Sequence, residues 1–367
     1  MLSRFEFRRR QFFEQIREIT LRKNIRRIAL LAAAASLLAV SCATGDEDSA
    51  ASTSPLLTEV PAGVSLAVAA NTAKVALTTS GELSKLPFTV SSWPAVQAGP
   101  DVIQAFRGGS VDVATNAGIP PIHAHATGLD AKIVGVKVRT TPLYKLATAP
   151  GTTINGLGDL RGKKIGFSPG QAQGLIVLRT LKTAGIRTDE VQLIDLSSTK
   201  FLTALQAKEI DVDPLAEPSL TKYLDKYRSD GATAIATPAV DALSVLWAPT
   251  SVLRDESKAA AVAEFVKFWA RGEVWAWEHP EEWIDAYYVK DQSVSAADGK
   301  RILATAEKPY FPQNWDEAIT WEQETIELVT DAGFFGNSFP AAELFDRRFE
   351  KIAFDAVPAP YRTKGQQ

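Results

Sequence analysis

The sequence predicts an α/β protein with two similar lobes. Residues 98–121 read as a short helix, a strand and a tight loop that leads into a second helix. A fainter copy of the same order occupies residues 201–218. The length of 367 residues also suits two domains better than one. Two such units indicate two α/β lobes whose loops face each other across a cleft.

The first unit carries the local signals for each of its elements. Pro100 and Asp101 suit the first turn of a helix, and Gly109 follows its end. Valines flank an aspartate in the strand at 111–113, and the chain turns at 116–118 before the next helix. A loop between a strand end and a helix start is where open α/β sheets bind ligands, and the helix end favours an anion.

Several short runs carry a family resemblance, and it covers nearly all of the chain after residue 60. They are Ser92-Trp93, Ala-Gly-Pro at 98–100, Gly-Ser-Val-Asp at 109–112, Gly-Ile-Pro-Pro at 118–121, Asp-Leu-Arg-Gly-Lys-Lys-Ile at 159–165, Gly170, and residues 212–218. These runs resemble the substrate-binding proteins of ABC transporters, most of all the branch that captures aliphatic sulfonates, taurine or nitrate. The resemblance implies a two-lobed periplasmic-binding-protein fold of type II-like form, with a cleft between two α/β domains joined by two crossovers.

The amino end predicts export and a lipid anchor. Arg26-Arg27 precede the apolar run 28–40, and Cys42 follows a serine, which resembles a lipoprotein processing site. We expect a signal peptide at 1–41 and a lipidated Cys42 with a flexible tether at 42–60. The protein would then sit at the outer face of the cytoplasmic membrane or in the periplasm. The alternative is plain signal cleavage beside an incidental cysteine.

Charge and composition exclude several classes of function. Residues 1–41 carry nine Lys or Arg and three Asp or Glu, which is a net charge of +6. The net charge of the whole chain is −3, so the net charge of residues 42–367 is −9. This acidic balance argues against a nucleic-acid partner. A single cysteine allows no disulfide and no Cys-based cluster. His123 and His125 point apart on a helix and only His279 lies elsewhere, so we expect no metal and no cofactor.

The domain boundaries follow from two apolar strands, at 143–147 and 242–248, that we take as the crossings between the lobes. The first lobe is expected to comprise 61–145 and 248–367, and the second 146–247. Helices predicted in the carboxyl part span 257–270, 275–288, 295–307, 315–332 and 341–354. Their tryptophans are interpreted as packing against the first lobe, with Phe311 and Trp315 placed at the cleft rim.

Three regions of the first lobe supply candidate ligand-binding residues. Asn71 and Thr72 follow the first strand, where they would donate hydrogen bonds to a ligand or cap the next helix. The resemblance implies that Trp93 contributes an aromatic ring to the pocket, although packing is the alternative. The turn after the strand at 111–113 supplies the remaining candidates Asn116, Ala117, Gly118 and Ile119.

The second lobe is expected to close the site from the opposite side. Its loop supplies Ser168, Gly170, Gln171 and Ala172, and Gly170 would allow close approach of the backbone to a ligand. Sulfonate binders carry several serines and a histidine here, and this sequence departs from that pattern. Glu217 precedes a proline, which would aim its carboxylate into the cleft at a ligand ammonium group. A solvated loop glutamate is the alternative.

The sequence therefore favours a monomeric, non-enzymatic solute receptor that works with an ABC permease and its ATPase. Its ligand would be a small anion or zwitterion, with an aliphatic sulfonate or taurine preferred. Nitrate, bicarbonate and a vitamin-precursor heterocycle remain alternatives, as do an enzyme on the same fold and an adhesion or scaffold protein. Saturable ligand binding without turnover separates the receptor from the last two.

Overall fold

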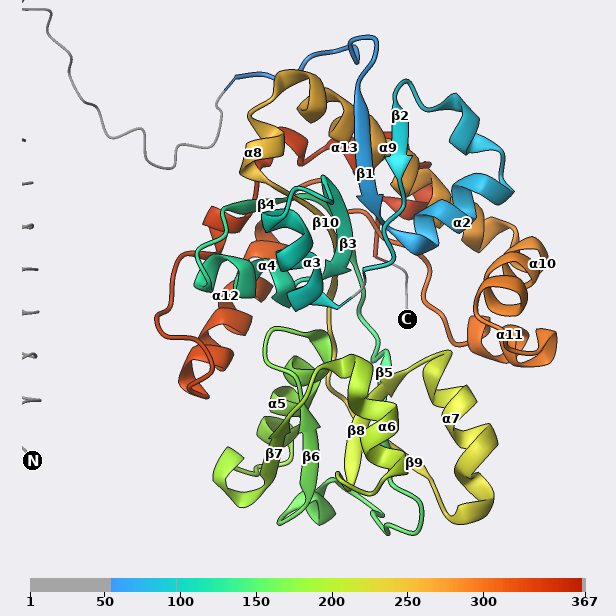
Figure 1. Ribbon diagram of the computed structural model, residues 1–367, viewed down its shortest axis with the longest axis vertical. Helices are drawn as coiled ribbons and strands as arrows, with labels where there is room; N and C mark the ends of the chain where they lie inside the picture. The colour runs from blue at the N-terminus through green and yellow to red at the C-terminus, as the bar shows by residue number, and fades with distance from the viewer. Residues whose placement is uncertain (1–53, 97, 365–367) are drawn as a thin grey trace, which may run out of the picture. The chain divides into compact units, whose positions relative to one another are not determined.

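The computed structural model describes residues 54–96 and 98–364. These residues form two α/β lobes, one above the other in Figure 1, each built on a five-stranded mixed sheet. The predicted signal peptide, Cys42 and the tether up to residue 53 lie outside the described residues. In the described part of the chain, no helix combines the length and the hydropathy needed to cross a membrane.

The first sheet has the strand order β2-β1-β3-β10-β4. β1 pairs in parallel with β2 and β3, whereas β10 runs antiparallel to β3 and β4. Buried side chains occur at consecutive positions in the central strands because helices cover both faces of the sheet. The strands span β1 (Ser65–Ala69), β2 (Thr89–Ser92), β3 (Val113–Ala117), β4 (Ala131–Val138) and β10 (Leu243–Pro249).

The second sheet repeats this pattern with the order β7-β6-β8-β5-β9. β6 pairs in parallel with β7 and β8, and β5 runs antiparallel to β8 and β9, so β5 takes the place that β10 has in the first sheet. The predicted similarity of the two lobes is thereby confirmed. The strands span β5 (Tyr144–Thr148), β6 (Lys164–Phe167), β7 (Gln192–Asp195), β8 (Val212–Ala216) and β9 (Ala234–Ala236).

Two crossings connect the sheets, and they lie a few residues before the predicted boundaries. The chain passes from β4 to β5 through residues 139–143 and returns from β9 to β10 through residues 237–242. The boundaries predicted at 145/146 and 247/248 fall inside β5 and β10. The apolar run of β10 is not the return crossing itself, because it is buried between β3 and β4 of the first sheet.

Helices cover both sheets, and the carboxyl-terminal helices extend along the first lobe (Figure 1). Asp255 caps the longest of them, since its carboxylate accepts the N–H groups of Ser257 and Lys258, each at 3.0 Å. The helices span α2 (Asn71–Thr79), α3 (Gly99–Arg107), α4 (Ile119–Ala126), α5 (Ala172–Thr183), α6 (Phe201–Gln206), α7 (Ser219–Tyr227), α8 (Thr250–Leu253), α9 (Glu256–Glu278), α10 (Pro280–Trp283), the π-helical η6 (Ile284–Asp291), α11 (Ala296–Leu303), α12 (Asp316–Asp331) and α13 (Ile352–Ala356).

Some helix predictions fail where the backbone turns sharply. The sequence predicts the first helix at 73–86. In the structure α2 ends at Thr79, because Gly81 adopts φ +77°, and only a short 3-10 turn follows at Glu82–Lys85. The helix predicted at 341–354 is divided into the 3-10 turns Ala341–Leu344 and Arg347–Phe349 and the short α13.

The main core lies between the first sheet and the carboxyl-terminal helices. Trp247 packs edge-on against Phe106 at 4.6 Å, and Trp269 packs against Phe311 at 5.5 Å. Trp269 is fully buried, so its predicted packing role is confirmed. The placement of Phe311 and Trp315 at the cleft rim is wrong, because both rings are buried in this core.

Candidate functional site

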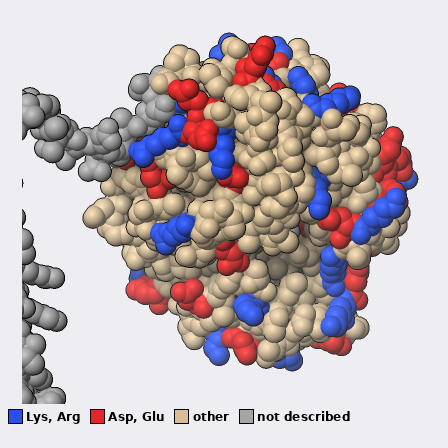
Figure 2. Space-filling view, turned by 45° about the horizontal axis from the view of Figure 1, so that its top comes forward, with Lys and Arg blue, Asp and Glu red and all other residues tan. Residues whose placement is uncertain are grey.

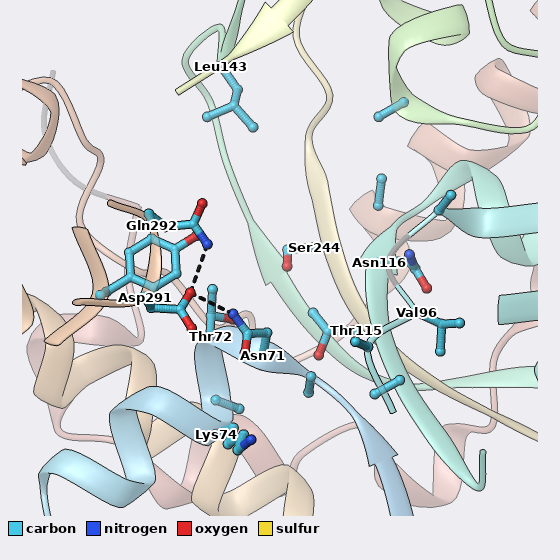
Figure 3. Close-up of a pocket in the computed structure, with 18 of the residues that line it drawn as sticks. Asn71, Thr72, Lys74, Val96, Thr115, Asn116, Leu143, Ser244, Asp291 and Gln292 are labelled. Carbon is cyan, nitrogen blue, oxygen red and sulfur yellow. Dashed lines mark hydrogen bonds between the residues drawn. The ribbon is translucent and has the colours of Figure 1, made fainter. Parts of the chain in front are cut away.

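A cavity of about 1010 Å³ lies between the two sheets and receives residues from both. The first lobe contributes the start of α2, the end of β3 and the start of β10, as Figure 3 shows. The second lobe contributes the start of α5 and the loop between β8 and α7. Helix α9 and η6 form a further wall. The site therefore lies where strand ends meet helix starts, as open α/β folds favour.

Neutral polar groups dominate the side that the first lobe provides. Asn71, Thr72, Asn116 and Ala117 line the cavity, together with Thr115 and Ser244, which sequence reasoning missed. The Asn71 amide nitrogen donates to the Asp291 carboxylate at 2.9 Å. The indole N–H of Trp247 donates to the Asn116 side-chain oxygen at 2.9 Å and so fixes the orientation of that amide.

Trp93 lies both at the cavity and at the edge of the main core. It lines the cavity, and its ring also lies 6.3 Å from the ring of Phe265, at the edge of the main core. The packing against Phe265 limits how far the Trp93 ring can move, so the aromatic surface offered to the cavity is held in place.

The second lobe presents the amino-terminal end of α5. Gln171 and Ala172 line the cavity, but the Gln171 side chain is turned into the protein. Its oxygen accepts from the Ser168 hydroxyl and from the Ser198 N–H, the latter at 2.9 Å. These bonds hold the loop against residue 198 and leave the start of α5, rather than the Gln171 amide, facing the cavity.

Four predicted ligand contacts lie away from the cavity lining, namely Ser168, Ile119, Gly170 and Gly118. Ser168 is 3% exposed and its hydroxyl donates to the side-chain oxygen of Gln171, and Ile119 is buried in the core of the second lobe. Gly170 adopts φ +74° and lies against His123, whose Nδ1 would be 2.2 Å from an added Cβ. Its close approach is therefore to the other lobe and not to a ligand.

Gly118 meets a buried carboxyl group of the protein itself. A Cβ on Gly118 would lie 1.7 Å from Oε1 of Glu322, so this position at the start of α4 has no room for a side chain. Glu322 is 1% exposed, and burial raises its pKa to about 8, with a further rise from Asp241. The helix start that was expected to hold the anionic ligand is thus covered by a protein carboxyl group.

Glu217 lines the cavity but is already engaged. Its carboxylate accepts from the Thr221 N–H at 3.1 Å, from the Thr221 hydroxyl at 2.6 Å, and from Arg301 of α11 at 3.4 Å. The Glu217–Pro218 peptide bond is cis. Glu217 therefore bridges the second lobe to the carboxyl-terminal helices, and a ligand ammonium group would have to share its charge with Arg301.

A second contact between the lobes is buried. The Arg179 guanidinium of α5 lies 3.8 Å over the Trp321 ring of α12 and donates to the Thr325 hydroxyl at 3.0 Å. Asp241 of the return crossing is also close, and burial raises its pKa to about 6 despite the opposing charges of Arg139 and Arg179. The positive charges of Arg139 and Arg179 therefore stabilise the ionised form of Asp241, which burial alone would disfavour.

The wall formed by α9 and η6 was not found from the sequence. Lys137 forms an ion pair with Glu273 at 2.6 Å, and Tyr287 stacks on Trp283 at 4.6 Å. Burial, followed by the charges of neighbours including Asp291 and Glu273, raises the pKa of Tyr287. Helical periodicity marks these residues only as packing positions, and nothing local indicates that they border a cavity.

His123 and His125 lie on α4, as predicted, and have different partners. The His123 ring stacks on Phe335 at 5.4 Å, and the His125 ring stacks on Phe339 at 3.8 Å. Burial, and then the charge of Arg107, lowers the pKa of His123. Across residues 54–96 and 98–364, no group of His, Cys, Asp and Glu is arranged to hold a metal ion.

Known proteins resemble this chain in sequence. It matches the family described as NMT1/THI5 like over residues 95–283, which is more than half of its length. Two relatives carry the name "Putative aliphatic sulfonates-binding protein". The protein of Escherichia coli (strain K12) is 30% identical over 134 residues, 36% of this chain and 42% of that relative, so the match spans less than half of its length. That of Bacillus subtilis (strain 168) is 21% identical over 267 residues, 72% of this chain and 78% of that relative.

Solved structures share the fold. The alkanesulfonate-binding protein SsuA from Xanthomonas axonopodis pv. citri, bound to MOPS, superposes with a TM-score of 0.69 at 19% identity, covering 77% of this chain and 98% of that chain. The desulfurization enzyme DSZB superposes less well, with a TM-score of 0.52 at 14% identity, over 79% of this chain and 99% of that chain. The two-lobed binding-protein fold is therefore shared by a binding protein and an enzyme, and does not decide function alone. From the family match over more than half of its length, the chain belongs to the NMT1/THI5-like family.

Proposed function

We propose that this protein is the extracytoplasmic solute-binding component of an ABC importer, and that it captures an aliphatic sulfonate or taurine. The observation that carries this is the cavity between the sheets, lined from both lobes by neutral polar groups and by the starts of α2 and α5. Such groups stabilise a bound anion without a full opposite charge. The names of the relatives support a sulfonate in particular.

The proposed mechanism is closure of the two lobes on the solute. Because the site takes hydrogen-bonding groups from both sheets, a ligand contacts all of them only when the lobes are together, and binding shifts the population to that state. The crossings at 139–143 and 237–242 are the proposed hinge. The closed form would dock on a permease that an ATPase drives.

The predicted division into two lobes, the signal peptide at 1–41 and the anchor at Cys42 complete the proposal. A diacylated Cys42 would hold the receptor at the membrane surface, and the tether would let it reach the permease. We propose that the protein acts as a monomer and performs no catalysis.

Calorimetric titration of the purified protein tests the ligand. The panel contains ethanesulfonate, taurine, nitrate, bicarbonate and ethyl methyl sulfone as a neutral control. We expect tight, saturable binding of a sulfonate and far weaker, but measurable, binding of the sulfone. Tight binding of nitrate or bicarbonate alone would replace the sulfonate assignment, and conversion of a bound ligand, followed by mass spectrometry, would favour an enzyme.

A variant pair tests the position of the site. Thr72→Val removes a hydroxyl from the cavity wall with little change of shape, and we expect it to weaken sulfonate binding by about two- to tenfold. Thr79→Val makes the same change at the exposed end of the same helix and should leave the affinity unaltered. Equal affinities for both variants would move the site away from the start of α2.

A further inference from the structure

The charged residues around the cavity are not equivalent. Two positions are neutralised by direct ion pairs, Lys137 with Glu273 at 2.6 Å and Glu217 with Arg301 at 3.4 Å. The Asp291 carboxylate accepts amide hydrogen bonds from Asn71 and Gln292. The remaining charged lining residues are Lys74 and Arg139, and neither forms an ion pair with another described residue.

Arg139 contacts the return crossing through its backbone and its side chain, whereas Lys74 is an exposed residue on α2. The Arg139 N–H donates to the Ala242 carbonyl at 2.7 Å, and its Nη1 donates to the Asp241 carbonyl at 3.4 Å. Arg139 is thus fixed at the point where the two crossings run side by side. It is half-buried, so its guanidinium is less screened by water than that of a surface arginine.

Arg139 belongs to a group of charged residues behind the cavity. Asp241 interacts with both Arg139 and Arg179, and burial raises the pKa of Asp241 to about 6 against the effect of these two cations. Arg179 also interacts with Glu324 and Glu322, so its charge already has carboxyl groups beside it. Arg139 is the cation of this group that borders the cavity.

We propose that Arg139 fixes the anionic group of the ligand and makes the pocket select anions over neutral solutes. The proposal rests on the function proposed above and deepens it. The planar guanidinium can donate two parallel hydrogen bonds to two oxygens of a sulfonate, which a lysine cannot do. The Arg139 side chain borders the cavity at the crossings. The anionic group of the ligand would therefore bind next to the part of the chain that connects the two lobes.

Arg139→Gln and Arg139→Lys test this role against Lys145→Gln, which removes an exposed cation from β5 close to the same crossing. For the anion that binds the parent protein most tightly, we expect Arg139→Gln to weaken affinity by about ten- to a hundredfold. Arg139→Lys should recover part of that loss, and Lys145→Gln should bind as the parent does. Circular dichroism and thermal melting establish that each variant is folded.

The selectivity for charge separates this role from general damage to the cavity. The ratio of affinities for ethanesulfonate and ethyl methyl sulfone should fall in Arg139→Gln, whereas a structural defect would weaken both ligands alike. Parent-like sulfonate affinity in Arg139→Gln overturns the inference and leaves the proposed function standing. Loss of nitrate binding, in a protein that ignores sulfonates, supports Arg139 and removes the sulfonate assignment. A parent protein that prefers the neutral sulfone overturns both.

Discussion

The second lobe contacts the carboxyl-terminal helices on two flanks, and the two contacts differ in their exposure to water. On one flank Arg179 lies between Trp321 and Thr325 of α12, close to the buried carboxyl groups of Asp241 and Glu322. On the other flank Glu217 meets Arg301 of α11, whose side chain is 54% exposed. Arg179 and Trp321 are half-buried and Thr325 is fully buried, so the first contact is less exposed to water than the second.

This difference indicates which contact can separate and reform. A surface ion pair exchanges its partner for water at little cost, with a typical strength of about 0–1 kcal/mol. Partners that are buried lose far more when one of them is removed, because the other is left without compensation. We therefore expect the flank at Arg179 to stay together while the flank at Glu217 opens and closes. Figure 2 shows Lys and Arg side chains interspersed with Asp and Glu side chains on the face that it draws.

Removal of the buried cation should have the largest effect. Arg179→Met deletes the charge and the hydrogen bond to Thr325, and we expect it to lower the free energy of unfolding by about 3 kcal/mol. Urea unfolding measures this, with Lys182→Met on the exposed side of the same helix as the control. Equal stability of the two variants would show that the buried contact contributes no more than a surface charge.

A substitution that crowds the same flank should have the second-largest effect on stability. Gly118→Ala places a methyl group 1.7 Å from Oε1 of Glu322, so the carboxyl group or α12 must move, at a cost of about 2 kcal/mol. Gly158→Ala is the matched control, because an added Cβ there meets no atom within 4 Å. A tolerated Gly118→Ala would mean that the Glu322 side chain can leave its place easily.

The buried carboxyl group predicts a dependence of stability on pH. The pKa of Glu322 is about 8 in the folded protein, above its ordinary value of 4.5, so the folded state holds a proton that the unfolded state has lost. This contribution is fully present below pH 4.5 and is lost as the pH rises to about 8. Glu322→Gln should lack this decline in melting temperature, and parallel curves for the two proteins would contradict the assignment.

The exposed flank should show the smallest effect. Arg301→Gln breaks the pair with Glu217, and we expect less than about 1 kcal/mol of change in stability and at most about a fivefold change in ligand affinity, reduced by salt. Lys300→Gln removes the neighbouring pair with Glu281, which lies within the first lobe, and serves as control. A loss as large as that of Arg179→Met would show that both flanks are equally rigid.

Part of the site could be predicted because its signals are local. Asn71 and Thr72 follow β1, and Asn116 and Ala117 are the last residues of β3. Strand ends that precede helices are recognisable from neighbouring residues. Ala172 at the start of α5 was found in the same way. Predictions that depended on what lies opposite a residue were less successful. Gly118 and Gly170 have the backbone freedom of a ligand-binding loop, but each one accommodates another part of the protein.

By itself, the sequence determined the alternation of helices and strands, the two similar units and the strand-end residues of the first lobe. These depend on caps, turns and apolar spacing within a few neighbouring residues. Only the tertiary structure decided that Asp291 meets Asn71 across 220 positions, and that Arg301 reaches Glu217 across 84. Such contacts depend on how the lobes and the carboxyl-terminal helices pack, and no local pattern encodes which distant side chain fills a given space.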